Sequence, residues 1–465
     1  MNVYRRAQSD EYGASRIDAA EFDAFLQENP HIQYIDCMFA DLCGVVRGKR
    51  IARSELERVF ESGLQIPYTI YFLDARGDMV DPLGRGLTDG DPEGAAWPVP
   101  GTLTRVNWSQ RPHGQVLMTL CDAKGEPYFG EPRNVLQRIV DRFADLELVP
   151  VVASELEFYF MDRERAKTGL PQQPAAPGAG KRDAAPSVYG ISDLDRCGEV
   201  LAAITEAATT QNLPAMATSS ESAPGQFEIN PRHVADAVRA GDHAVFLRQV
   251  VRAVARQHGL EASFMAKPYL ALAGNGMHVH VGVKHRSGKY VFDDGGAKGS
   301  ELMRFAIGGL QAVMAESMAL FAPNVNAYRR FVSNALVPRN KRWGYNNRST
   351  GIRAHGGAGE ARRIEHRVAG ADANPYLVLA AVLAGIHHGI SQRIDPGQPF
   401  EGNASTFVDQ TIPFSIDAAL LALENGSIMR EYLGRSYVDL YCATKRTELD
   451  RFRNFIPAHE YDWYL

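Results

Sequence analysis

The sequence predicts an α+β protein with a small, strand-rich N-terminal domain, residues 1–128, and a larger domain, residues 129–465. Two observations lead to this prediction. Strand-like segments dominate before residue 128, whereas an amphipathic helix begins at Glu131-Pro132, after which helices alternate with strands. A chain of 465 residues is also long for a single hydrophobic core, so two domains are expected.

The N-terminal domain is predicted from short runs of aromatic and β-branched residues. Residues 33–39 read as a strand, 41–44 as a turn, and Val45-Val46 as the start of the next strand. Residues 116–121 read as a further strand that ends before the turn signal Lys124-Gly125. Between these strands, the stretch 75–102 is rich in Gly, Pro and Asp and is expected to be irregular surface.

The larger domain begins with apolar residues at helical spacing after Pro132, which suits a first-turn position. Further helices are expected from near Ser192, from 234 to 258 with a stop at Gly259, and after Asn374-Pro375. The Pro-, Ala- and Gly-biased segment 165–187 is expected to be a long exposed loop.

Composition indicates an ordinary globular protein and argues against two classes of partner. Lys and Arg number 50 against 55 Asp and Glu, so no polycationic surface for nucleic acid is expected. The most apolar helix candidate, 377–386, is too short to cross a membrane, and the N-terminus lacks an apolar signal segment. Five scattered cysteines without a Cys-x-x-Cys pair indicate a reducing compartment, the cytoplasm.

Four short segments combine one apolar face with one ionisable face. Alternate residues of a strand point to the same side, so Glu155 shares a face with Glu157, and His278 with His280. In 363–367 that face carries Arg, Glu and Arg, and in 226–229 it carries Glu228. Taken singly, each segment is explained by an amphipathic strand with one solvated face, and His280 alone by a structural role.

Four such segments in one chain favour a shared site, because like-charged carboxylates repel and cannot be buried unpaired. The proposed ligand set is dominated by hard oxygen donors, which favours more than one Mg²⁺ or Mn²⁺ ion. Its members are Glu155, Glu157, Glu221, Glu228, His278 and Glu365.

A cluster of arginines accompanies these segments and points to phosphoryl transfer. The planar guanidinium fork suits phosphate and carboxylate oxygens, and metals together with arginines stabilise transferring phosphoryl groups. No P-loop or Rossmann fingerprint is present. The cluster comprises Arg329, Arg330, Arg348, Arg353, Arg362, Arg363 and Arg367.

These segments, in this order, resemble the glutamine synthetase family over nearly the whole chain. The resemblance includes Ser154–Glu157, Glu221–Glu228, Gly276–His280, Asn326–Arg330 and Arg363–Arg367. Residues 41–51, 264–269 and 367–377 are similar to its γ-glutamylpolyamine branch, to which γ-glutamylputrescine synthetases belong. The resemblance implies an N-terminal β-grasp domain and a larger catalytic domain with an antiparallel sheet and flanking helices. It also implies homo-oligomeric rings, usually a dodecamer of two hexamers.

The resemblance also implies roles for individual residues in an ATP-dependent ligase that forms γ-glutamyl amides through γ-glutamyl phosphate. Two or three Mg²⁺ or Mn²⁺ ions would lie in the ligand set above. Nucleotide and phosphate contacts would come from His280, Arg353 and Arg363, with Arg348 stabilising the transferring phosphoryl group. Glutamate would be held by Gly274, Arg330 and Arg367, and Asp41 would complete the site of the next subunit. From spacing alone, Asp41 is equally a turn residue beside Gly44.

One departure from the family concerns the amine. Glutamine synthetases carry an acidic residue in the loop after the arginine that corresponds to Arg330, but residues 331–347 contain none, and the corresponding place is near Leu336. Ala273 also stands where the family has an asparagine. The leading hypothesis is therefore a ligase that joins glutamate to putrescine or a related amine in amine catabolism. The alternatives are a glutamine synthetase, a monoamine-specific ligase, or an inactive ring with a structural or regulatory role.

Overall fold

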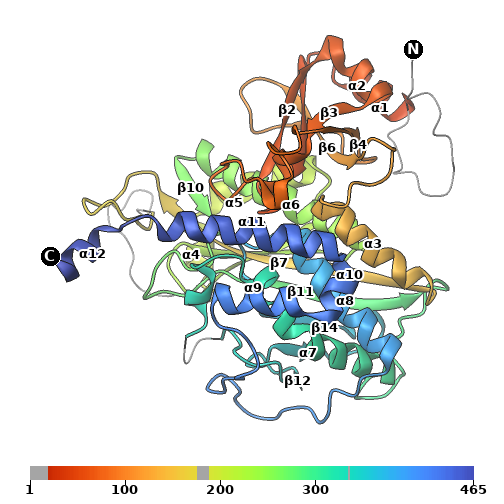
Figure 1. Ribbon diagram of the computed structural model, residues 1–465, viewed down its shortest axis with the longest axis vertical. Helices are drawn as coiled ribbons and strands as arrows, with labels where there is room; N and C mark the ends of the chain where they lie inside the picture. Colours follow the sequence, from red (N-terminus) through yellow and green to blue (C-terminus); the bar gives the residue numbers. More distant parts are fainter. Residues whose placement is uncertain (1–18, 175–187, 333–335) are drawn as a thin grey trace.

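A computed structural model describes residues 19–174, 188–332 and 336–465, and it confirms the predicted α+β class (Figure 1). A curled N-terminal sheet stands above a larger body of helices and strands. Its strand order is β2-β1-β6-β4-β3, with β5 on β6. The strands are β1 (Tyr34–Ala40), β2 (Val46–Ala52), β3 (Leu64–Pro67), β4 (Glu93–Pro98), β5 (Thr104–Val106) and β6 (His113–Cys121), with helices α1 (Ala19–Glu28) and α2 (Leu56–Ser62).

The predicted strands at 33–39, 45–46 and 116–121 are present as β1, β2 and β6, and the turn 41–44 lies between the first two. The prediction that 75–102 is irregular is wrong at β4. This strand pairs with β6 through Ala96 and Leu120, and with β3 through Ala96 and Leu64. Its small residues allow two neighbouring strands to approach, and this close packing buries a segment whose composition resembles a loop.

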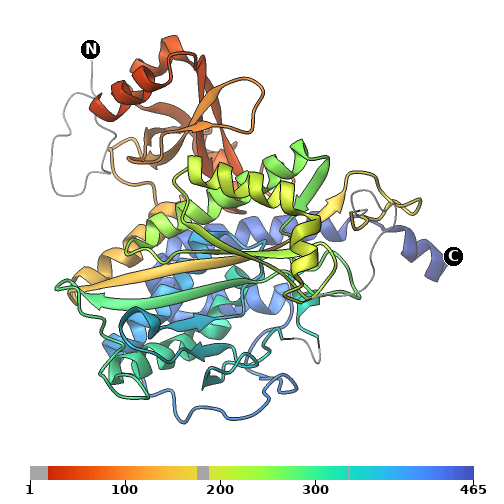
Figure 2. The same cartoon turned by 180° about the vertical axis from the view of Figure 1, so that it is seen from behind.

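The larger sheet aligns all four ionisable segments on adjacent strands. Its order is β12-β13-β14-β11-β7-β9-β8, with β10 on β7. Figure 2 shows the long strands β7 and β11 running across the body. The bounds are β7 (Leu148–Asp162), β8 (Ala215–Ser220), β9 (Gln226–Pro231), β10 (Leu260–Ser263), β11 (Met277–His285), β12 (Trp343–Tyr345), β13 (Ile352–Ala354) and β14 (Ile364–His366).

Helices pack against one face of this sheet. α3 and α6 contact β7, and α8 packs on α3, α6 and α7. Leu156 and Phe158 of β7 point into this core and are buried. The helices are α3 (Pro132–Ala144), α4 (Ile191–Arg196), α5 (Gly198–Thr210), α6 (Ala237–Gln257), α7 (Glu301–Phe321), α8 (Pro375–Gln392), α9 (Ile416–Asn425), α10 (Ser427–Leu433), α11 (Arg435–Arg453) and α12 (Ala458–Tyr464).

Two of the helix starts predicted from the sequence are present in the structure. Pro132 is the first residue of α3, and the Asn374 side chain accepts a hydrogen bond from Tyr376 N at 3.0 Å where α8 begins. The helix expected from 234 begins instead at Ala237, because Asp236 caps it through Arg239 N. The helix expected near Ser192 is two helices, α4 and α5, that meet at Cys197.

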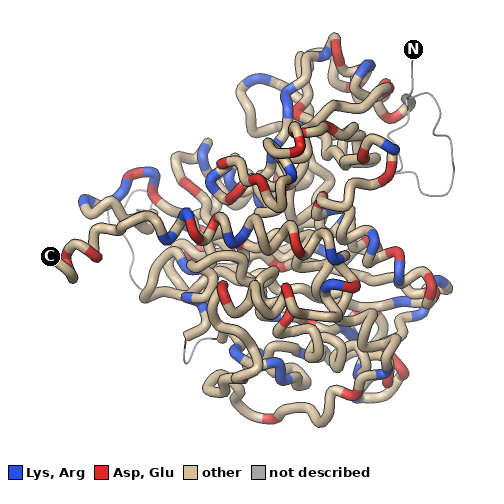
Figure 3. Tube along the Cα trace, viewed as in Figure 1, with Lys and Arg blue, Asp and Glu red and all other residues tan. Residues whose placement is uncertain are grey.

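Two further sequence expectations concern surface features. Of the loop predicted over 165–187, residues 165–174 are irregular, and 175–187 lie outside the described residues. Basic and acidic positions are both scattered over the whole of the described trace (Figure 3). Across the described ranges, every helix is too short or too polar to cross a bilayer.

Glycine contacts allow α7 and α8 to approach closely. A Cβ added at Gly309 would lie 2.5 Å from Gly389 Cα, and one added at Gly389 would lie 2.6 Å from Gly309 N. Gly309→Ala is therefore expected to lower the free energy of unfolding by about 1–3 kcal/mol through overpacking, despite the better helix propensity of alanine. Thermal or denaturant unfolding measures this change.

Gly198→Ala is the matched control, since Gly198 begins α5 and an added Cβ there meets nothing within 4 Å. We expect this variant to be as stable as the parent or more stable. Equal stability of the Gly309 and Gly198 variants would contradict the proposed contact.

Candidate active site

A cavity of about 790 Å³ opens on the face of the large sheet opposite the buried apolar side chains. All the predicted site residues except Asp41 line it, and they come from elements between β7 and β14. The predicted residues in the lining are Glu155, Glu157, Glu221, Glu228, Gly274, His278, His280, Arg330, Arg348, Arg353, Arg363, Glu365 and Arg367.

Strand register brings the ionisable residues together in pairs. Glu157 lies opposite Glu228 across β7 and β9, and His278 lies opposite Glu155 across β11 and β7. His280 lies opposite Glu365 across β11 and β14. Opposite residues in an antiparallel pair have Cβ atoms about 4.5–5.5 Å apart, so their side chains share one site.

Histidines hold the central carboxylate in place. Glu155 Oε1 lies 2.9 Å from His280 Nε2, and Glu155 Oε2 lies 3.4 Å from His278 Nδ1. Burial alone would raise the pKa of Glu155, but these two histidines outweigh it and the pKa is lowered. Glu155 is therefore an anion at neutral pH.

The carboxyl groups towards β9 repel one another, and this repulsion favours their protonated forms. Burial, followed by repulsion from Glu157 and Glu228, raises the pKa of Glu221 to about 8. Burial, followed by repulsion from Glu155 and Glu157, raises the pKa of Glu228 to about 7. This crowding of acids in a half-buried pocket fits a site for cations, which would favour the charged forms.

Three groups of donor atoms, each within 4.8 Å of one another, fit a metal ion: Glu157–Glu228–His278, Glu155–His278–Glu365 and His280–His355–Glu365. The first two contain five of the six ligands predicted from sequence, while Glu221 lines the same pocket outside these groups. Carboxylates dominate the donor set, which suits Mg²⁺ or Mn²⁺.

His355 also lines the cavity and was not among the residues predicted from the sequence. Its Nε2 lies 2.8 Å from Glu365 Oε2. The residue follows β13 by one position, and β13 pairs with β14 so that Arg353 faces Glu365. The only signal in the sequence was its spacing of two from Arg353, on what becomes the same face.

Of the seven arginines in the predicted cluster, five line the cavity and two lie outside it. Arg353 Nη1 lies 2.9 Å from Glu365 Oε2, Arg367 pairs with the other oxygen of Glu365, and Arg363 donates from Nε to His280 Nδ1 at 3.2 Å. Arg348 is exposed at the mouth, where Nη1 lies 3.4 Å from the Tyr189 hydroxyl. Arg329 is exposed elsewhere, and Arg362 donates to the carbonyls of Gly296 and Ala297, so these two lie outside the cavity.

The predicted glutamate-binding residues Gly274, Arg330 and Arg367 all line the cavity. Arg330 is buried and donates from Nη1 to Val368 O at 3.1 Å. A Cβ added at Gly274 would lie 2.6 Å from Ala266 O and 2.8 Å from Arg330 Cγ, so glycine is needed for this approach. Next to it, the Ala273 carbonyl accepts a hydrogen bond from the Tyr159 hydroxyl at 2.7 Å.

Comparisons with known proteins agree with this geometry. The family model described as "Glutamine synthetase, catalytic domain" matches residues 129–464. The chain belongs to the glutamine synthetase family. Members use ATP and divalent metals, and the chain is an ATP-dependent glutamate–amine ligase of this family, a γ-glutamyl ligase.

The relatives of this chain include amine ligases. The chain is 40% identical over 461 residues to gamma-glutamylputrescine synthetase PuuA of Escherichia coli (strain K12), covering 98% of this chain and 97% of the relative. It is 31% identical to glutamate–isopropylamine ligase of Pseudomonas sp, covering 94% and 96%. A solved structure named "Apo GmaS without ligand" superposes with a TM-score of 0.82 at 27% identity, covering 96% and 99%.

Asp41 does not line the cavity of its own chain. Its carboxylate is fully buried in the turn between β1 and β2, where Oδ1 accepts from Val45 N and Oδ2 from Arg47 Nε, both at 2.9 Å. Burial raises its pKa to about 6, although Val45 and Arg47 oppose this shift. Within one chain Asp41 therefore stabilises the turn, and its role in a neighbouring site stays a prediction.

The mouth of the cavity is apolar on the side where the family carries an acidic residue. Leu336 is 61% exposed and lines the mouth with Leu270, Leu272, Val332 and Val337. An alkyl chain can bury apolar surface against such a rim, whereas ammonium has none to bury.

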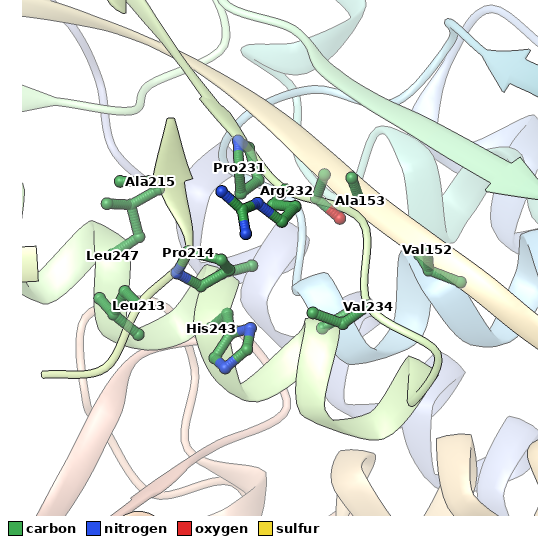
Figure 4. Close-up of a pocket in the computed structure, with 13 residues that line it drawn as sticks. Val152, Ala153, Leu213, Pro214, Ala215, Pro231, Arg232, Val234, His243 and Leu247 are labelled. Carbon is green, nitrogen blue, oxygen red and sulfur yellow. The ribbon is translucent and has the colours of Figure 1, made fainter. Parts of the chain in front are cut away.

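A smaller cavity on the other face of the sheet is a packing defect. Figure 4 shows it between β7, α6 and the loop before β8, with His243 at its edge. Its volume of about 10 Å³ barely admits one water molecule. Burial lowers the pKa of His243 to about 4, so this histidine is neutral at pH 7.

Proposed function

We propose that this ligase joins the γ-carboxylate of L-glutamate to an alkyl amine, putrescine or a related polyamine, with ATP as the energy source. The observation that carries the proposal is the apolar rim around Leu336 at the mouth of a cavity that otherwise carries the carboxylate and arginine set of the family. The relative named gamma-glutamylputrescine synthetase, at 40% identity, supports it.

In the proposed reaction the γ-carboxylate attacks the γ-phosphorus of ATP and releases ADP. The neutral amine then displaces phosphate from γ-glutamyl phosphate and loses a proton as the amide forms. Arg330 and Arg367 bind the glutamate carboxylate, and Arg348 reaches the transferring phosphoryl group from the mouth. Mg²⁺ or Mn²⁺ ions held by the carboxylates and His278 would neutralise the phosphate oxygens. The activation is needed because a carboxylate has no good leaving group, whereas phosphate departs once its charge is stabilised.

A comparison of amines tests the proposal. Steady-state kcat/KM is measured for putrescine, longer polyamines, monoamines and ammonium with glutamate and ATP. We expect a diamine or polyamine to have the highest value. Preference for ammonium would establish a glutamine synthetase, preference for a monoamine would establish a monoamine-specific ligase, and absence of ATP turnover with every amine would establish an inactive ring.

Leu336→Glu is expected to shift preference towards ammonium. A carboxylate at the rim can bind ammonium and accept its proton, while its hydration weakens the apolar contact with an alkyl chain. We expect the ratio of kcat/KM for ammonium over putrescine to rise by about tenfold or more, which corresponds to about 1.4 kcal/mol. Leu336→Gln, without the charge, is the control, and an equal rise with glutamine would refute the electrostatic reason.

We further propose that the chain forms homo-oligomeric rings, two hexamers in a dodecamer. The C-terminal α12 projects away from the body in Figure 1, and large apolar side chains in this helix and directly beside it are exposed. These include Phe455, Ile456, Trp463, Tyr464 and Leu465. Burial against another subunit would remove this surface from water.

If Asp41 acts in the site of the next subunit, two inactive variants are expected to complement each other. Asp41→Asn preserves the acceptor for Val45 N but lacks the charge, while Arg348→Ala removes the phosphoryl contact. Co-assembled subunits would pair an intact Asp41 with an intact Arg348 in some interfaces. Activity well above either variant alone is expected, and no recovery despite mixed assembly would leave Asp41 a turn residue only.

A further inference from the structure

A second polar cleft of about 420 Å³ lies where the N-terminal turn meets the large domain. We call it the junction pocket. Its walls come from residues 42–45 after β1, from Arg248 and Arg252 on α6, from 262–265, from 372–377, and from Lys445 and Glu448 on α11. None of the metal-site residues lines it, so it is separate from the catalytic cavity.

The junction pocket has an excess of positive charge. Arg248 is only 4% exposed, yet its hydrogen bonds go from Nη2 to the carbonyls of Ala371 and Ala373, and no carboxylate pairs with it in the described chain. Within the part of the chain that the structure describes, its Nε is buried without a hydrogen-bond partner. Arg252 stacks over the Phe264 ring at 5.1 Å, on the same ring that Arg248 approaches at 5.7 Å.

The acidic residues of the pocket do not cancel this charge. Lys445 Nζ lies 2.6 Å from Glu448 Oε1, so these two neutralise each other. Asp372 Oδ2 accepts from Asn324 Nδ2 at 2.7 Å, and burial raises the pKa of Asp372. The pocket wall thus carries two arginines, Arg248 and Arg252, against the single remaining carboxyl group of Asp372, whose burial disfavours its charged form.

A buried arginine without a paired anion is costly unless a ligand supplies the counter-charge. We propose that the junction pocket binds a small oxyanion, a carboxylate or phosphate, held by the guanidinium groups of Arg248 and Arg252. Guanidinium forks match both oxyanions, and the cavity volume suits a small molecule.

Such a ligand would contact the turn that follows Asp41. Asn374 Nδ2 donates to Asp41 O at 2.9 Å and to Leu42 O at 3.2 Å, which joins this turn to the segment after β14. Asn374 and Leu42 belong to the wall of the junction pocket, and Asp41 lies directly before that wall. Occupancy therefore holds the N-terminal turn against the large domain.

The test measures the melting temperature of the full-length protein, free of nucleotide, against inorganic phosphate and against succinate at constant ionic strength. Arg252→Gln is the main variant, because Arg252 is exposed and its loss leaves the core intact. Arg256→Gln is the matched control, one turn further along α6, exposed and outside the pocket. Arg248→Lys is a second variant, and Arg348→Ala reports on anions in the catalytic cavity.

We expect a saturable rise in melting temperature with the parent, Arg256→Gln and Arg348→Ala, and an affinity at least about tenfold weaker with Arg252→Gln and Arg248→Lys. A response to phosphate alone or to succinate alone supports the proposal and identifies the oxyanion. No saturable response, an unchanged response of both pocket variants, or a response that only Arg348→Ala removes overturns it.

Discussion

Glu157→Gln is expected to lower kcat/KM for glutamate–amine ligation by on the order of 10³-fold. Glu157 faces Glu228 across the strand pair, its Oε1 lies 3.9 Å from His278 Nε2, and its Oε2 accepts from Gly276 N at 2.7 Å. Glutamine keeps the shape and an acceptor for Gly276 N but loses the negative charge that a divalent cation requires. Steady-state kinetics at saturating Mg²⁺ measures the loss.

The same substitution is expected to leave the metal-free protein at least as stable as the parent. Repulsion from Glu157 is the largest electrostatic contribution to the raised pKa of Glu221, so removing this charge relieves the crowding. Glu261→Gln is the matched control, because Glu261 lies on β10 beside β7 and pairs with Arg165 at 3.3 Å, away from the cavity. Full activity of Glu157→Gln would show that the acidic cluster is not the metal site.

The stabilisation of the protein by Mg²⁺ or Mn²⁺ is expected to grow as the pH rises from about 6 to 8. Folding raises the pKa of Glu221 to about 8 and that of Glu228 to about 7, well above the ordinary value of 4.5. A carboxyl group with a raised pKa stabilises the folded state fully below its unfolded pKa, and this contribution is lost as the pH rises through the folded value. The metal-free protein therefore loses stability over this window.

Divalent cations reverse the trend, because they bind the deprotonated carboxylates that destabilise the metal-free protein. We expect the melting temperature gained on adding the cation to be several degrees larger at pH 8 than at pH 6. Glu221→Gln is expected to flatten this difference, while Glu261→Gln keeps it. A gain that falls with rising pH would contradict protonated carboxyl groups in the site.

The sequence predicted which ionisable residues share a strand face, because strand alternation is a local property. Glu155 and Glu157, or His278 and His280, share a face whichever strands flank them, and the apolar residues between them show which face is buried. The helix starts at Pro132 and Asn374 could also be predicted from the sequence, because helix caps depend on a few neighbouring residues.

Other features depended on partners distant in sequence. β4 is a strand because its small residues fit between β3 and β6, which no local pattern reveals. His355 became a site residue only when β13 paired with β14 and placed it beside Glu365. The apolar residues keep their helical spacing across the boundary between α4 and α5, so the sequence does not indicate that the helix breaks there.

The sequence by itself determined the α+β class, the ionisable faces and thirteen residues that line one cavity, because side-chain periodicity follows from backbone geometry. Only the tertiary structure decided which carboxylates oppose each other, because register depends on the pairing of whole strands. It also placed Asp41 in a buried turn and left Arg248 without a paired carboxylate among the described residues. Burial and long-range contacts set both environments, and a linear pattern contains neither.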